Sequence, residues 1–142
     1  MSSSATSTAP VRPHRDVARL ALPRLAWGIA IAVVVNLIVF GIASFAGASM
    51  LAGDRGVSWI LVVITTVGAM VPGAIVTGLL ARWRGGAIRV MAWVGLVFGL
   101  VTAPSPIVVA GDATTAIALA SMHVLTGVIW FLAIRPRSAS AA

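Results

Sequence analysis

The sequence predicts an all-α polytopic membrane protein, a four-transmembrane-helix bundle with both termini in the cytoplasm. Three observations support this fold class. The 142-residue chain is 60% hydrophobic and only 9% charged, whereas a soluble domain is about 25% charged. Its apolar residues fall into four runs of about 20 residues, the length of helix that crosses a hydrocarbon core about 30 Å thick. Its arginines gather on one side of the resulting topology, as the positive-inside rule describes.

The N-terminal segment, residues 1–23, is predicted to be a disordered basic tail in the cytoplasm. It begins with the small and polar letters MSSSATSTAPV, which have no helical or strand periodicity. The transmembrane domain is predicted to cover residues 24–135, followed by a short cytoplasmic tail at 136–142. The first span, at about 25–45, is too long for the apolar core of a cleaved signal peptide. We expect it to be retained as an anchor.

The second span is predicted at about 58–80 and contains a proline in its middle. Pro72 has no backbone N–H to donate to the Gly68 carbonyl, so this helix should be kinked. The third span is predicted at about 90–109.

Two prolines, Pro104 and Pro106, lie towards the outer end of the third span. Because a residue before proline avoids the helical region, regular helix should end near Ala103. The stretch to Ala110 should then be kinked or extended. It either marks the membrane edge or lines a wet vestibule near the outer surface. The fourth span is predicted at about 114–134.

The orientation follows from the arginines. One arginine, Arg55, lies in a predicted outer loop. Nine lie on the predicted inner side: Arg12, Arg15, Arg19, Arg24, Arg82, Arg84, Arg89, Arg135 and Arg137. This bias predicts cytoplasmic termini in a bacterial inner membrane. The tryptophans are expected to form interfacial belts, with Trp59 at the outer boundary and Trp27, Trp83, Trp93 and Trp130 towards the inner one. The positive charge is explained by topology, and nucleic acid is not predicted as a partner.

Small residues four apart mark the faces on which membrane helices pack. The candidate packing glycines are Gly73 in the second span, Gly95 and Gly99 in the third, and Gly127 in the fourth. We expect these faces to pack within one chain, although the same faces could join two copies in a homo-oligomer.

Asn36 and His123 form a candidate intramembrane polar pair, because both lie near the predicted midplane of the bilayer. A polar group in hydrocarbon needs a partner. We expect His123 to be a buried hydrogen-bonding residue near Asn36. The alternative is a proton relay or a ligand contact, since intramembrane ionisable residues are often functional.

Asp112 is predicted to cap the N-terminus of the fourth helix in the sequence GDATT, where its carboxylate meets the positive end of the helix. It lies eleven residues before His123, about 16 Å along a helix, which is too far for a direct hydrogen bond.

The chain resembles an uncharacterised actinobacterial family of short four-transmembrane-helix proteins, a domain of unknown function. The order of features carries the resemblance: a basic, Ser/Thr-rich N-terminus, four spans and a proline-containing outer end of the third span. The specific letters are Pro104, Pro106, Asp112, Thr115, Met122, His123 and Gly127. The resemblance implies the four-span fold and implies no activity, cofactor or catalytic residue.

We predict no enzymatic activity, no cofactor and no metal site. Cysteine and glutamate are absent and there are three aspartates, and no phosphate loop, paired-histidine motif or Ser/His/Asp set is present. Small four-helix drug exporters rely on a membrane-embedded glutamate, which this chain lacks. The leading hypothesis is a structural or partner-binding component that contacts the lipid bilayer and a second copy or another membrane protein. The alternative is a small transporter or ligand-binding channel that uses an outer vestibule and His123.

Overall fold

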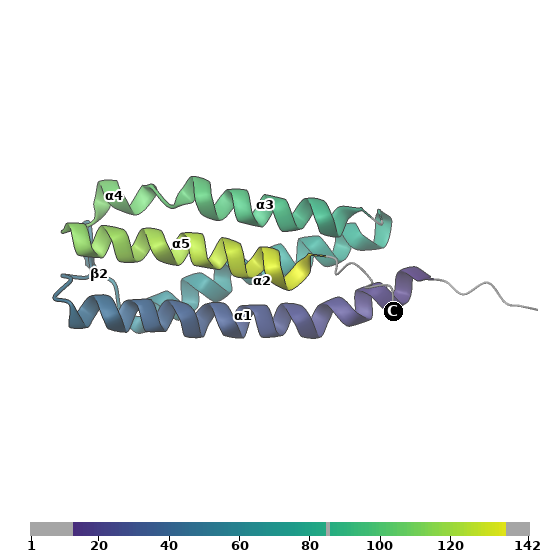
Figure 1. The fold of residues 1–142 in the computed structure, drawn as a ribbon, viewed down its shortest axis with the longest axis horizontal. Coiled ribbons are helices and arrows are strands. Elements are labelled where there is room, and N and C mark those ends of the chain that lie inside the picture. The colour runs from purple at the N-terminus through teal and green to yellow at the C-terminus, as the bar shows by residue number, and fades with distance from the viewer. Residues whose placement is uncertain (1–12, 85, 136–142) are drawn as a thin grey trace, which may run out of the picture.

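The structure is a computed structural model that describes the backbone of residues 13–84 and 86–135. Its elements are, in order, α1 (Pro13–Phe45), β1 (Leu51–Ala52), β2 (Arg55–Gly56), α2 (Trp59–Trp83), α3 (Ala87–Thr102), α4 (Ser105–Val109) and α5 (Ala113–Ile134). Four long helices lie side by side, and consecutive ones run in opposite directions (Figure 1).

All four predicted spans are present as helices that are long and apolar enough to cross a membrane. These spans are Pro23–Phe45, Trp59–Trp83, Ala87–Val109 and Ala113–Ile134. The prediction of an all-α protein with four transmembrane helices is therefore confirmed, while the orientation in the membrane remains a prediction. The chain is a multi-pass membrane protein.

The first helix begins earlier than the span that it contains. α1 starts at Pro13, so residues 13–23, which the sequence assigned to a disordered tail, are helical. Pro13 can begin a helix because the first helical position needs no N–H donor, and the residues after it are rich in Ala, Leu and Arg, which favour helix. Residues 1–12 and 136–142 of the predicted tails lie outside the described part of the chain.

Regular helix in the third span ends at Thr102, close to the predicted Ala103, and the short helix α4 follows after a turn at residues 103–104. Ala103 has helical backbone angles, φ −58° and ψ −33°, and its N–H still bonds to the Gly99 carbonyl. The expectation that Pro104 would force Ala103 out of the helical region is therefore wrong. Pro106 leaves the Thr102 carbonyl without an N–H partner, and the Ser105 hydroxyl donates to that carbonyl at 2.8 Å. This substitute bond offsets much of the cost of the break, and α4 continues as a short helix.

The predicted kink in α2 at Pro72 remains a prediction. The assigned helix runs unbroken through this proline from Trp59 to Trp83.

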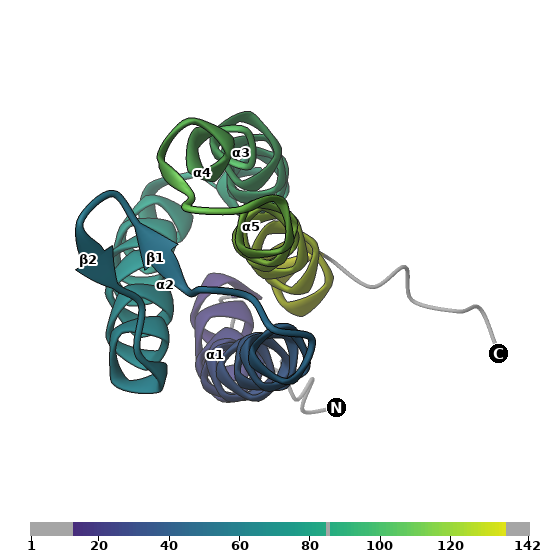
Figure 2. The same ribbon diagram turned by 90° about the vertical axis from the view of Figure 1, so that its left-hand side faces the viewer.

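The helices are not packed equally on one another. α5 packs along both α1 and α3, and α2 packs mainly on α1, whereas α2 and α3 contact each other much less. In the view from the end that carries β1 and β2, α5 lies on one side of the bundle and α2 on the other (Figure 2). This arrangement leaves the side between α2 and α3 as the most loosely closed part of the bundle.

Large apolar side chains face outwards, as they should in a lipid solvent. Along α1, Ile31, Val34, Ile38 and Ile42 recur at helical spacing and are all exposed. The inward positions are small or polar: Ala32 is fully buried and Asn36 is 2% exposed. Burial of small residues lets the backbones approach closely, which is how helices associate in a membrane.

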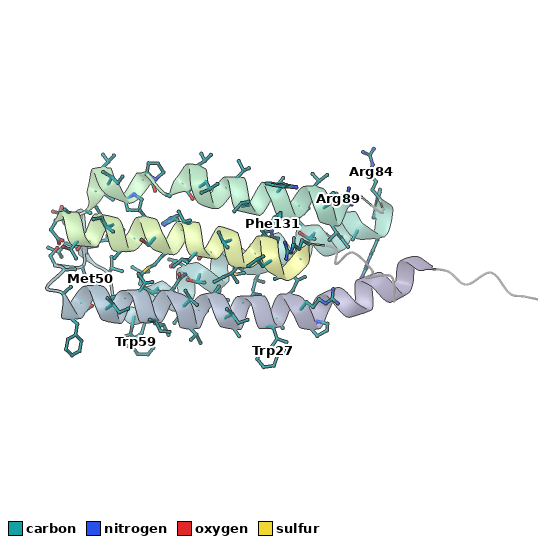
Figure 3. The ribbon with its side chains drawn as sticks, viewed as in Figure 1. Trp27, Met50, Trp59, Arg84, Arg89 and Phe131 are labelled. Carbon is teal, nitrogen blue, oxygen red and sulfur yellow. The ribbon has the colours of Figure 1, made fainter. Side chains whose placement is uncertain are left out.

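The two ends of the bundle differ in charge. The arginine end carries Arg24, Arg82, Arg84, Arg89 and Arg135, which are exposed or lie at helix termini. Figure 3 shows Arg84 and Arg89 at this end and Met50 at the opposite one. That opposite end, the hairpin end, is formed by β1, β2 and the connection from α4 to α5. Leu51 and Ala52 pair with the strand Arg55–Gly56.

Candidate functional site

A cavity of about 560 Å³ lies between α2, α3 and α5, with Asn36 contributed by α1. Its walls are mainly apolar. Among the described residues that line it there is no Asp, Glu, Arg or Lys. A volume of this size is typical of sites that hold a small organic molecule.

The cavity opens sideways between α2 and α3. Its lining includes Leu61 and Ala69 on α2 and Val94 and Phe98 on α3, and these four residues are exposed on the surface of the bundle. α2 and α3 contact each other little along this side. These positions lie within the spanning segments.

Trp130 closes the cavity towards the arginine end. It is 5% exposed, and its indole Nε1 donates to the Met91 carbonyl at 2.9 Å. A Cβ atom placed on Gly95 would overlap the indole, and one on Gly73 would lie 3.0 Å from Trp130 Cη2. These two candidate packing glycines therefore make room for a side chain.

Trp130 does not belong to an interfacial belt, and this expectation is corrected. The indole N–H of Trp130 already has a hydrogen-bond acceptor inside the protein. The residue therefore does not need the polar groups of the membrane interface as a partner. Trp27, Trp59, Trp83 and Trp93 are each at least half exposed, and the labelled Trp27 points away from the bundle (Figure 3).

The other two candidate packing glycines make a direct contact between helix backbones. A Cβ atom on Gly99 would lie 2.7 Å from the His123 carbonyl oxygen and 2.9 Å from Gly127 Cα. One on Gly127 would lie 3.2 Å from Gly99 Cα. The backbones of α3 and α5 thus touch at Gly99 and Gly127, and no larger residue fits at Gly99 without moving a helix.

Asn36 is the centre of a buried polar cluster that joins three helices. Its amide Nδ2 donates to Thr66 Oγ1 on α2 at 3.0 Å and to Thr126 Oγ1 on α5 at 2.9 Å. Its carbonyl oxygen Oδ1 is buried and has no hydrogen-bond partner among the described residues. An unpaired buried polar atom costs about 1–3 kcal/mol, so this oxygen is an unexplained feature of the site.

His123 also lines the cavity, but it does not pair with Asn36. Its Nδ1 lies 2.8 Å from the Leu119 carbonyl one turn earlier in α5. Because a carbonyl can only accept, Nδ1 carries the hydrogen. No direct hydrogen bond joins Asn36 and His123 in the described part of the chain, and this part of the polar-pair hypothesis is corrected. The Asn36 amide bonds to threonines on α2 and α5. The His123 imidazole bonds instead to a carbonyl of its own helix.

The hairpin end is held to α5 by Asp112. Its Oδ1 accepts from the Thr115 N–H at 2.8 Å, which is the geometry of an N-cap. Its Oδ2 accepts from the Ser49 N–H and from the hydroxyls of Ser49 and Thr115. These donors, led by the Ser49 hydroxyl and then by Thr115, hold the pKa of the Asp112 carboxyl well below its usual range. They stabilise its charged form.

Further hydrogen bonds connect the segments at the hairpin end. Thr115 Oγ1 accepts from the Met50 N–H at 3.1 Å, and the Gly53 N–H donates to the Val109 carbonyl at 2.6 Å. Asp112 therefore joins the loop between α1 and α2 to the start of α5, and it is a structural residue placed away from the cavity.

A family model matches residues 15–140, and its description is a family of unknown function, DUF6069. The chain belongs to this family. Membership in DUF6069 agrees with the resemblance to an uncharacterised family and adds no activity. No curated protein and no solved structure matches the chain.

Three residues of this DUF6069 member were missed by sequence reasoning: Thr66, Thr126 and Trp130. Threonine in a membrane helix commonly bonds to a carbonyl of its own helix, as Thr65 does with Leu61 here. Its presence therefore signals little. Depth was the available signal, because Thr66 and Thr126 lie inside their spans, as Asn36 does.

Proposed function

We propose that this protein is a non-catalytic membrane component that binds a hydrophobic small molecule in the cavity between α2, α3 and α5. The observation that carries the proposal is a mainly apolar cavity of about 560 Å³, with no Asp, Glu, Arg or Lys in its described lining, that opens sideways between α2 and α3. Of the two hypotheses from the sequence, ligand binding gains support from this cavity. A purely structural role would need no such space, because membrane helices gain stability by packing closely.

Binding is favoured over transport. A transporter must expose its site to both sides of the membrane in turn. In this protein Trp130 occupies the space between Gly73 and Gly95 and is hydrogen-bonded to Met91. Transport would require this buried indole to move, and the described residues of the lining include no Asp or Glu that could couple such a movement to protons.

The absence of catalysis is part of the proposal. His123 is the single titratable side chain among the described residues of the cavity lining, and its Nδ1 is engaged with Leu119. General acid–base or nucleophilic chemistry needs a second group that orients or activates the first. Besides His123, the polar groups of the described lining are hydroxyls and one amide. These groups are poor general acids and bases, which favours binding over reaction.

We further propose that the protein lies in the cell membrane with both termini in the cytoplasm. The arginine end of the bundle would then face inwards and the hairpin end outwards. Reporter fusions after Arg137 and within residues 84–87 should report a cytoplasmic location, and one within residues 53–56 an external location. A C-terminal fusion that reports an external location would contradict this orientation.

The test of binding is to identify what is purified with the protein from its native membrane. We expect organic extraction of the protein in mild detergent, followed by mass spectrometry, to give one class of hydrophobic molecule enriched over bulk lipid. Ala69 lines the open side of the cavity, so Ala69→Phe should fill the opening and remove this molecule.

The matched control is Ala30→Phe, which adds the same ring at an exposed position of α1 outside the cavity. The control should retain the molecule. Identical extracts from the unsubstituted protein, Ala69→Phe and Ala30→Phe would contradict ligand binding. Recovery of a stoichiometric membrane protein that is lost with Ala69→Phe would instead support a partner helix at the open side.

A further inference from the structure

His123 places an unused hydrogen-bond acceptor on the cavity wall. Its Nδ1 donates to the Leu119 carbonyl, so in a neutral imidazole the other ring nitrogen, Nε2, is an acceptor. Among the described residues that are not exposed, Asn36 Oδ1 is the one side-chain nitrogen or oxygen that is buried without a partner. Nε2 of the half-buried His123 has no protein partner either. It is therefore not buried, and a bound molecule can reach it.

The position of His123 on α5 directs this accessible nitrogen into the cavity. On the helical wheel, His123 lies between Gly127, which touches α3, and Thr126, which bonds to α1. All three residues line the cavity, as does Leu119 one turn earlier. The other face of α5, which carries Val124, has its own surface depression, and His123 is not part of it. The free edge of the imidazole therefore faces the cavity.

The lining changes from polar to apolar along the bundle. The α3 backbone at Gly99 lies against the α5 backbone at His123 and Gly127. Thr102, almost one turn nearer the hairpin end of α3, therefore lies close to the level of the His123 ring. Ser105 continues the polar lining towards the hairpin end. Towards the arginine end the lining residues are apolar or glycine: Met70, Gly73, Met91, Val94, Gly95 and Trp130.

The polar groups at this end can accept further hydrogen bonds, but their own hydrogens are already used. Thr102 Oγ1 donates to the Phe98 carbonyl at 2.7 Å, and Ser105 Oγ donates to the Thr102 carbonyl at 2.8 Å. The described lining has no Asp, Glu, Arg or Lys, so a charged ligand would lose its hydration without a counter-charge. The complementary head group is therefore neutral and donates a hydrogen bond, as a hydroxyl group does.

We propose, building on the function proposed above, that the cavity binds a neutral amphiphile with a hydroxyl head group, and that this hydroxyl donates a hydrogen bond to His123 Nε2. The head group lies at the polar end of the cavity, near the level of Thr102. The apolar tail runs towards Trp130. The molecule enters sideways between α2 and α3, where Ala69 and Phe98 are exposed and line the cavity.

Trp130 reports on the tail end of the cavity. It is 5% exposed, whereas the other four tryptophans are each at least half exposed: Trp27, Trp59, Trp83 and Trp93. Changing these four to Phe leaves Trp130 as the single source of tryptophan fluorescence, which a bromine atom in contact with the indole quenches. Trp130 lies seven residues after His123, about 10 Å along α5, a distance that an octyl chain spans.

The probes are two brominated chains that differ at one end. In ω-bromooctanol the bromine and the hydroxyl group lie at opposite ends, and in terminal bromononane a methyl group replaces the hydroxyl group. At equal concentrations in the membrane, we expect saturable quenching of Trp130 by bromooctanol at a concentration about five- to tenfold lower than by bromononane, the effect of one buried hydrogen bond. His123→Leu should remove this difference, because leucine has no acceptor. The matched control His123→Gln retains an acceptor and should keep most of it.

Nitrogen NMR tests the hydrogen bond itself in the chain with all its tryptophans. His14 and His123 are the two histidines, so isotope-labelled histidine gives a simple spectrum, and His14→Asn identifies the signals of His123. Bromooctanol should move the Nε2 resonance upfield, as happens when an imidazole nitrogen accepts a hydrogen bond. Bromononane should leave this resonance in place.

The outcomes separate this inference from the function on which it rests. Equal saturable quenching by the two compounds, or an Nε2 resonance that bromooctanol does not move, would overturn the hydroxyl assignment. A preference for bromooctanol that survives in His123→Leu would overturn the role of His123. Movement of the resonance without quenching would overturn the orientation of the tail. Absence of saturable quenching together with an unmoved resonance would overturn ligand binding itself. The two compounds decide the proposal even where His123→Leu fails to fold.

Discussion

The two sides of α3 are closed in opposite ways. Towards α5, Gly99 and Gly127 bring the helix backbones together, so that even one added carbon atom would clash. Towards α2, the helices contact each other little and a cavity of about 560 Å³ remains. In lipid the hydrophobic effect does not close such a gap, because acyl chains solvate apolar surfaces as well as a leucine does. Close packing therefore occurs where small residues permit it, and the α2–α3 side stays open.

The strongest test of this contrast is to enlarge one glycine at the tight contact and one in open space. Gly99→Leu should destabilise the protein by about 3 kcal/mol, because the new side chain must separate the α3 and α5 backbones. Gly78→Leu on α2 places the same side chain in open space and should change stability by less than about 0.5 kcal/mol. Thermal unfolding in detergent measures both. Similar losses from the two substitutions would show that the α3–α5 contact is not the tight one.

The next effect concerns the polar cluster of Asn36, Thr66 and Thr126, which joins α1, α2 and α5. Asn36→Ala should cost about 1–2 kcal/mol, since it removes the bonds to Thr66 and Thr126. In a double-mutant cycle with Thr126→Val we expect a coupling of about 0.6–2 kcal/mol. The matched cycle of Asn36→Ala with His123→Leu should be additive, because no bond joins those side chains. Additivity in the first cycle and coupling in the second would restore the pair expected from sequence.

Asp112 should give a smaller effect that depends on pH. Its carboxyl pKa is lowered in the folded protein by Ser49 and Thr115. A lowered folded-state pKa means that its contribution to stability is present above the unfolded value of about 3.9 and is lost as the pH falls below it. Asp112→Asn should therefore lower the Tm at neutral pH and flatten the decline of Tm in acid.

Asp54→Asn is the control for Asp112, because Asp54 lies exposed in the hairpin turn. This substitution should leave the Tm and its pH dependence almost unchanged. The same acid profile in both variants would contradict the role of Asp112 in joining the hairpin end to α5.

The smallest effect is expected at His123. Its Nδ1 bonds to a carbonyl of its own helix, which already takes part in the helical ladder. His123→Gln should consequently change stability by less than about 1 kcal/mol in thermal unfolding. A loss as large as that of Gly99→Leu would mean that the imidazole joins helices in the membrane.

The sequence by itself determined the number and the approximate length of the spanning segments. Hydrophobic runs of about 20 residues leave one way to satisfy every backbone group in lipid, which is the helix. It also identified Gly99 and Gly127 as packing positions and placed Asp112 before the fourth helix. These features depend on local chemistry or on spacing along one helix, and both can be read from the letters.

The tertiary structure decided which helices touch and which polar groups meet. Asn36 and His123 share a depth, yet Asn36 faces Thr66 and Thr126 because rotation about each helix axis selects its partners. Trp130 resembled an interfacial residue, yet glycines on α2 and α3 leave room for its indole in the interior. The cavity arises because α5 packs on α1 and α3 while α2 packs on α1 and contacts α3 little, and no single segment of the sequence encodes that relation.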